Sequence, residues 1–575
     1  MAEMIIKNGV VYDPKNGIDG EKNEICIKDG KIVENVGSGA KIVDAGGCVV
    51  MAGGVDGHTH CAGKINTGRI MSPHDMRYAP IPGLSGEEPR TKLLRPQVGY
   101  NTPNTYAIGY RYAKLGYTSI AEAAITPMMA RHMHEEFEEI PILDKLGLVL
   151  MGSNWQVMQY IQDKDPEKLK AYLAWLLLAA RGYGVKIVNP GGGSSWTWGK
   201  NVAGLDDKVV DFDVTPADIL IGLAEANESL NLPHSIHVHC NNLGMPGNIS
   251  TTLDTMKLLE KVKTKRDRQV MHVTHVQFNA YTGTSWMDFA SGAQDVADYI
   301  NKRDHLTFDM GQLMFGPAMT MTADGPTEYR NARMMDAKWG NYDQELEDAG
   351  GVVPLAYSPQ HFVHATMWSI GLELALLVKD PWKVMFTTDN PNGGAFVNYP
   401  EGQALLMSDK KRQEILKGFP DMAMDRISLP NIDRELDWGE IATMTRAMSA
   451  KMLGLQETKG HLGVGADADV AIYDIQPDKV DPSVEHEKVK KALSFAKYTI
   501  KDGEIVVRDG EITATPKGKV YWVNAYENGV AQGEKDRLMT DLEERFKKYY
   551  SIQLSNYMVE DAYLPRPVEI RPEVI

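Results

Sequence analysis

Two histidines one residue apart, His58 and His60, are the first feature of this sequence that could do chemistry. They stand in the segment GGVDGHTHCAG at residues 53–63. In a β-strand, residues i and i+2 point to the same face. If the chain is extended here, both imidazoles lie on one face and can bind a single metal ion. Thr59 and Cys61 then point to the opposite face.

Four further residues suited to binding a metal or a proton stand near the ends of strand-like segments. They are Lys186 in GVKIVN, His239 in HVHCNN, His275 in HVTHVQ and Asp389 in FTTDNP. Each one alone has an ordinary structural explanation, such as a hydrogen-bonded imidazole, an ion-paired lysine or a helix-capping aspartate. Four such explanations coinciding at strand ends are improbable. We therefore interpret these residues and the histidine pair as one site.

Neighbouring histidines leave one ligand assignment open. His237 stands two residues before His239 and shares its face, so either could be the ligand. We prefer His239 because it lies nearer the end of the strand and the polar segment NNLG. His272 stands three residues before His275, so we expect it on the opposite face in a structural role.

The middle of the chain alternates predicted strands with helical segments. Apolar, strand-like segments occur at residues 117–127, 146–154, 184–192, 234–242, 268–277, 305–311 and 382–391. With the strand that enters His58 they make eight, and helix signals such as Thr215 before Pro216 lie between them. This pattern predicts a (β/α)8 barrel, whose chemistry lies at the C-terminal strand ends. The alternative is a doubly wound open sheet, but the glycine-rich phosphate loop that such folds often carry is missing after the first strand.

The two ends of the chain resemble each other. IKDGKIVE (27–34), IKDGEIVV (500–507) and VRDGEITA (507–514) each place an Asp-Gly pair between two short β-branched segments. Asp-Gly tolerates the positive φ angles of a tight hairpin turn. We predict one small β-sandwich domain that the chain leaves and later re-enters.

Domain boundaries follow from these patterns. We expect residues 1–51 and 450–520 to form the two parts of the β-sandwich and residues 52–449 to form the barrel. Residues 521–575 would be a C-terminal extension that contacts other subunits, because the last segment, 563–575, is rich in proline and predicted to be extended.

Composition narrows the class of protein. The formal net charge of −16 argues against binding to nucleic acid or to an anionic membrane. No signal peptide is recognised at the start, and the longest apolar run, 171–180, is too short to cross a bilayer. The four cysteines form no CxxC pair, so we expect reduced thiols in a cytoplasmic protein and no iron–sulfur cluster.

The order of the candidate ligands resembles the amidohydrolase superfamily with a two-metal site, and KGHLGVGADADVAIYD (459–474) is similar to its closing segment. The resemblance implies that His58, His60 and Asp389 bind one metal, that His239 and His275 bind the other, and that carboxylated Lys186 bridges both. Imidazole and carboxylate ligands suit two Zn²⁺ ions, and a desolvated lysine amine can capture CO2. Asp389 would be the catalytic proton acceptor and donor.

Longer segments resemble a narrower family, the A subunits of formylmethanofuran dehydrogenase in methanogenic archaea. They are IIKNGVVYDPKNGIDGEKNEICIKDGKIVE, GGVDGHTHCAGKINTGRIMSPHDMR, HVHCNNLGMPGN and TTDNPNGGAFVNYP. The resemblance implies reversible condensation of formate with methanofuran to N-formylmethanofuran. Formate would come through an internal channel from CO2 reduction at a partner subunit with a tungsten- or molybdenum-pterin, which works with iron–sulfur polyferredoxin subunits.

Two other functions remain open at this point. A cyclic-amide hydrolase, similar to dihydropyrimidinase or dihydroorotase, would use the same metals on another substrate. A non-enzymatic relative would use the barrel as a binding scaffold, but such relatives usually lose ligands and this chain has all six. The segments 65–86 and 191–201 are candidates for holding methanofuran.

Overall fold

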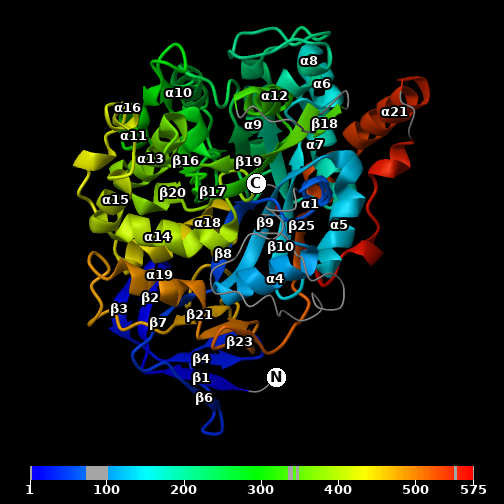
Figure 1. Ribbon diagram of the computed structural model, residues 1–575. Helices are drawn as coiled ribbons and strands as arrows, with labels where there is room; N and C mark the ends of the chain where they lie inside the picture. Colours follow the sequence, from blue (N-terminus) through cyan, green and yellow to red (C-terminus); the bar gives the residue numbers. More distant parts are fainter. Residues whose placement is uncertain (1–2, 73–101, 335–340, 345–348, 550–552, 574–575) are drawn as a thin grey trace.

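Eight parallel strands form a nearly closed barrel at the centre of the molecule (Figure 1). The computed structural model describes residues 3–72, 102–334, 341–344, 349–549 and 553–573. The barrel strands are β8 (Gly54–Thr59), β9 (Tyr117–Ile125), β10 (Asp144–Leu150), β11 (Gly184–Val188), β12 (Ile236–His239), β13 (Met271–Val273), β16 (Leu306–Asp309) and β20 (Val384–Met385). Each strand pairs in parallel with the next. The predicted (β/α)8 barrel is confirmed, and the open doubly wound sheet is wrong.

The barrel closes between its last and first strands through the residues that follow them. The His60 N–H donates to the Asn390 carbonyl over 2.8 Å, and Thr59 and Asn390 form an isolated parallel bridge. This closure brings the segment after β20 beside the end of β8, so Asp389 and the histidine pair become neighbours.

Helices cover the outside of the barrel (Figure 1). Helix α9 (Pro216–Ser229) begins as predicted, because Thr215 and Asp218 form a capping box and Pro216 occupies the first turn. Helix α7 (Pro166–Ala180) starts in a similar way at Asp165.

Two barrel strands are much shorter than predicted. β13 ends at Val273 and β20 ends at Met385, whereas the sequence predicted strands over 268–277 and 382–391. His275 then has φ 35° and Asp389 has φ 50°, in the left-handed region that disfavours side chains. The chain therefore turns sharply where these two candidate ligands stand, and strand alternation no longer predicts where they point.

Both chain ends build one region of two β-sheets below the barrel (Figure 1). The larger sheet joins β7 (Val49–Ala52) to β21 (Val470–Tyr473), with Val470 opposite Ala52. The smaller sheet contains β1 (Met4–Lys7) and β4 (Ile25–Lys28), and apolar side chains of the two sheets share one core. The predicted sandwich built from both ends is confirmed.

The predicted hairpins are present with the expected turns. β4 and β5 (Lys31–Val33) are joined by Asp29-Gly30, with φ 50° and 79°. β22 (Tyr498–Lys501) and β23 (Glu504–Arg508) are joined by Asp502-Gly503, with φ 48° and 79°. Both central residues have positive φ, as the turn of a two-residue hairpin requires.

An insertion between β16 and helix α13 (Phe362–Leu377) lies across the C-terminal end of the barrel (Figure 1). It contains β17 (Gly316–Thr322), α12 (Gly325–Met334), β18 (Asn341–Gln344) and β19 (Ala349–Tyr357), and the three strands form an antiparallel sheet. The sequence did not reveal this element.

The C-terminal segment packs on the barrel. β25 (Val520–Val523) pairs with the start of β10, and β26 (Pro567–Ile570) pairs with β25. Between them, helix α21 (Gln532–Tyr549) lies against α7 (Figure 1). The tail is thus more than an extended segment, and a contact with other subunits stays a prediction. Across the described residues, no helix has the length and apolar character needed to cross a membrane.

Candidate metal centre

The structure brings all six predicted site residues to one cavity at the C-terminal end of the barrel strands. His58, His60, Lys186, His239, His275 and Asp389 line it. His58 lies within β8, Lys186 within β11, and His239 ends β12, whereas the other three follow their strands. The barrel therefore positions half of the set directly and the loops after the strands position the rest.

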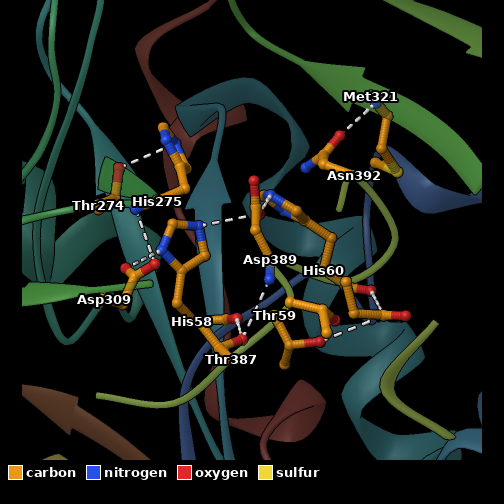
Figure 2. Close-up of polar contacts among 12 residues, drawn as sticks. His58, Thr59, His60, Thr274, His275, Asp309, Met321, Thr387, Asp389 and Asn392 are labelled. Carbon is orange, nitrogen blue, oxygen red and sulfur yellow. Dashed lines mark hydrogen bonds and ion pairs between the residues drawn. The ribbon is translucent and has the colours of Figure 1, made fainter. Parts of the chain in front are cut away.

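His58, His60 and Asp389 converge on one point. The Asp389 Oδ1 atom lies 3.1 Å from His58 Nε2 and 3.3 Å from His60 Nε2 (Figure 2). Atoms of the three side chains all lie within 4.8 Å of one another, a separation that one cation can bridge. Among the described residues, none donates a well-aligned hydrogen bond to Oδ1, so the three atoms face a common centre.

Lys186 is buried beside this group. Its side chain is 2% exposed, and no hydrogen bond to Nζ is found among the described residues. Burial lowers the pKa of Lys186 to about 8, although the nearby Asp389 and Asp309 carboxylates raise it. An isolated buried ammonium is costly, whereas a neutral amine is tolerated and can react with CO2.

His239 and His275 form the other side of the candidate centre. Their rings meet edge to face at 4.6 Å. His239 Nε2 lies 3.0 Å from Asp324, and Thr274 Oγ1 lies 2.9 Å from His275 Nε2 (Figure 2). His275 Nδ1 has no hydrogen-bond partner in the described part of the chain, and burial lowers the pKa of this imidazole well below its usual value. His275 is therefore neutral, as a metal ligand must be.

Two carboxylates behind the histidines were missed by sequence reasoning. Asp309 at the end of β16 lies 2.9 Å from His58 Nδ1, and Glu122 in β9 lies 2.9 Å from His60 Nδ1. Both place a carboxylate on the ring nitrogen opposite the candidate metal, which fixes the tautomer that leaves Nε2 free. The available signal was a charged residue inside each of two predicted buried strands.

The remaining histidines lie in a layer beneath the cavity. His237 Nε2 lies 3.2 Å from His58 Nδ1, and its ring stacks on His272 at 4.7 Å. Neither ring lines the cavity that His239 lines. His272 reaches Asp309 over 3.2 Å and so does not face away from the site as expected, because β13 ends before His275 and the alternation stops.

The donor set fits a pair of zinc ions. Burial opposes protonation of His60, but the Asp389 and Glu122 carboxylates outweigh it and raise the pKa to about 9. A divalent cation between these carboxylates would replace that proton. Imidazoles, a carboxylate and a lysine open to carboxylation are ligands that zinc accepts. Lys186 Nζ, His275 Nδ1 and Asp389 Oδ1, which the described residues leave without hydrogen bonds, are available to such ions.

Comparison with known proteins agrees with this fold and site. The model of the amidohydrolase family matches residues 41–507. The chain therefore belongs to the amidohydrolase family, whose barrel and metal-binding loops the structure reproduces.

Relatives that match the full length narrow the class. Protein FwdA of Methanocaldococcus jannaschii is 49% identical over 567 residues, which cover 98% of this chain and 97% of the relative. The corresponding protein of the formyltransferase/hydrolase complex Fhc of Methylorubrum extorquens is 33% identical, with 97% of each chain covered. In the crystal structure of that organism's FhcABCD complex with methylofuran, one chain matches with a TM-score of 0.88 at 32% identity, covering 99% of this chain and 100% of that one. The predicted resemblance to A subunits of formylmethanofuran dehydrogenase is confirmed, and the chain is an enzyme subunit.

The two segments predicted to hold methanofuran are placed differently. Residues 73–86 of the first lie outside the described residues, and Asn66 and Thr67 line a second cavity that adjoins His60. No residue of the second, 191–201, lines the metal cavity as far as the chain is described. The insertion contributes to this cavity instead, through side chains of β17, α12 and β19.

Proposed function

We propose that this chain is a binuclear amidohydrolase subunit that interconverts N-formylmethanofuran and water with methanofuran and formate. One observation carries the proposal: His58, His60 and Asp389 converge in a single cavity beside Lys186, whose amine no described residue hydrogen-bonds. The Fhc relative, whose complex holds methylofuran, supports a substrate of the same kind.

The six side chains divide between two ions. His58, His60 and Asp389 would hold one Zn²⁺, His239 and His275 would hold the other, and carboxylated Lys186 would bridge them. When bound, such ions polarise a carbonyl oxygen and lower the pKa of water to roughly 7.

Asp389 moves the proton. The neighbouring imidazoles outweigh burial and hold the pKa of Asp389 well below its usual value, so the carboxylate is ionised and can accept a proton. In hydrolysis it takes a proton from the water that attacks the formyl carbon. It then gives this proton to the nitrogen as the carbon–nitrogen bond breaks, which leaves formate and the amine. Condensation is the same sequence in reverse.

The experiment is an assay of the zinc-loaded full chain with N-formylmethanofuran, hydantoin and dihydroorotate. We expect formate release from the first substrate only. Turnover of a cyclic amide without release of formate would assign the chain to the cyclic-amide hydrolases. No turnover of any of the three would support a binding scaffold.

The direction of net flux would depend on partner subunits. Condensing a carboxylate with an ammonium in water is uphill, so we infer that formate arrives at high local concentration from a CO2-reducing tungsten- or molybdenum-pterin subunit served by iron–sulfur subunits. The four-subunit complex of the Fhc relative supports assembly with other chains. With ¹³C-labelled CO2 and excess unlabelled formate, the complete complex should form mainly labelled product. Full dilution of the label would contradict internal delivery.

A further inference from the structure

The cavity contains a second group of side chains that the proposed metal centre does not use. Four aromatic residues line it: Phe278, Tyr281, Trp286 and Tyr357, which we call the aromatic wall. The wall begins beside a candidate ligand, because the Phe278 ring lies 6.2 Å from that of His275. Tyr281 and Trp286 are held in place by a shared neighbour, the Phe289 ring, at 4.6 and 5.5 Å.

The Tyr281 hydroxyl is buried within the aromatic wall. The residue is 0% exposed, and no hydrogen bond to its oxygen is found among the described residues. Leaving such a group unsatisfied costs about 1–3 kcal/mol, so native proteins rarely do it without a ligand or an ordered water. Because Tyr281 lines the cavity, a bound molecule can supply the missing partner.

A carboxyl group enters the same cavity from the insertion. Glu328 on α12 is 0% exposed and accepts a hydrogen bond from Thr320 Oγ1 over 2.8 Å. Burial raises the pKa of Glu328 to about 8, although the Thr320 hydrogen bond lowers it. The site therefore favours a neutral acid when no cation is present, and a bound cation would supply the counter-charge that ionisation requires.

Tyr357 connects this carboxyl group to the reaction site. Burial raises the pKa of Tyr357, and the charges of both Glu328 and Asp389 raise it further. The Tyr357 hydroxyl donates to the Asn392 carbonyl over 3.1 Å, so its ring is fixed beside the loop that carries Asp389. A molecule lying along Tyr357 meets both carboxyl groups.

We propose that Glu328, Tyr281 and the aromatic wall form the binding site for the amine substrate, a primary ammonium attached through one carbon to a flat aromatic ring. Glu328 pairs with the ammonium, the Tyr281 hydroxyl hydrogen-bonds to the same end of the molecule, and the wall packs on the ring and attracts its cation. This inference rests on the proposed function, since it identifies the chemistry of the group that receives the formyl unit. The N-formyl product is neutral and does not need the Glu328 charge.

The test is calorimetric binding of benzylamine and benzyl alcohol to the zinc-loaded full chain, with hydrolysis of N-formylmethanofuran measured on the same samples. Glu328→Gln keeps the shape of the side chain and removes its charge. It should weaken benzylamine about tenfold and leave benzyl alcohol unchanged, because a charge-assisted hydrogen bond is lost. Tyr281→Phe should weaken both probes by about threefold, since one ordinary hydrogen bond is lost.

Glu373→Gln is the matched control, because Glu373 is a buried carboxyl outside the cavity that accepts hydrogen bonds from Ser428 and Leu429. It should leave both affinities unchanged. Equal benzylamine affinity in wild type and Glu328→Gln, with normal formate release, would overturn the amine site and keep the proposed function. Glu328-dependent benzylamine binding without formate release by wild type would overturn the proposed function and keep the amine site.

Discussion

His58 shows how a single residue is prepared on both sides. Its Nδ1 atom lies 2.9 Å from Asp309, and its Nε2 atom lies 3.1 Å from Asp389. The first contact orients the ring and the second places it in the cavity. His60 repeats the arrangement with Glu122 behind it and Asp389 in front. A pair of histidines at i and i+2 thus becomes a ligand pair only through carboxylates distant in sequence.

The choice between His237 and His239 is testable at this scale. His239 lines the cavity, whereas His237 lies below it against His58. His239→Ala should therefore lose zinc, measured by elemental analysis of the dialysed protein. His237→Ala should keep zinc and mainly lower the thermal stability. The reverse pattern would show that the ligand is one strand pleat deeper.

Asp389→Asn tests the proton transfer. The amide keeps nearly the same shape and cannot accept the proton, so turnover in both directions should fall by about 10²–10⁴-fold. Circular dichroism should show the wild-type fold, and metal analysis should find at least one zinc. Turnover near the wild-type rate would assign the proton transfer to another residue.

At the scale of elements, the site depends on where strands end. Thr387 links two ends, because its hydroxyl donates to the His58 carbonyl over 2.8 Å and accepts from the Asp389 N–H over 3.1 Å (Figure 2). The side chain of Asn392 links the same loop to the insertion by accepting the Met321 N–H over 2.6 Å. The metal cavity is therefore closed by elements that the ligands themselves follow.

Asp309→Asn tests whether the end of β16 orients the metal ligands. Removing the charge that holds His58 Nδ1 should weaken zinc binding about 10–100-fold, measured by competition with a chelator. Asp304→Asn is a matched control, because Asp304 lies before the same strand with a side chain that is 95% exposed. Unchanged zinc affinity in Asp309→Asn would mean that another neighbour, such as His237, orients the ring.

Sequence periodicity predicted the parts of this fold that repeat a simple rule. The Asp29-Gly30 and Asp502-Gly503 hairpins and the barrel follow from turn chemistry and from alternating strands and helices. The ligand set came from residue types at strand ends and from family resemblance. Periodicity could not reveal Asp309 or Glu328, because their roles come from contacts between segments far apart in the chain.

At the scale of the whole molecule, a buried ion network joins the barrel to both ends of the chain. Lys459 contacts Asp144 at the start of β10 and lies 2.8 Å from Asp467 and 2.6 Å from Asp469. Lys501 of the larger sheet lies 3.1 Å from Asp144. Although this network includes a group of aspartates that could hold a cation, the lysine ammonium groups already supply the counter-charge.

Lys459→Met should destabilise the protein as a unit. The apolar side chain fills similar space but leaves buried carboxylates without their counter-charge, which costs about 3–5 kcal/mol. The expected result is a lower urea midpoint than wild type. Lys451→Met is the control, because Lys451 is 29% exposed and its partner Asp267 is 83% exposed. Equal midpoints for the two variants would show that the network contributes little.

The central claim is that six residues hold two zinc ions that are required to release formate. Metal-free full chain in bicarbonate is titrated with Zn²⁺, and formate release from N-formylmethanofuran is measured at each addition, with Lys186→Ala in parallel. The account predicts that activity rises to a plateau at two equivalents per chain and that Lys186→Ala remains inactive throughout. A plateau at one equivalent, or full activity in Lys186→Ala, would contradict it.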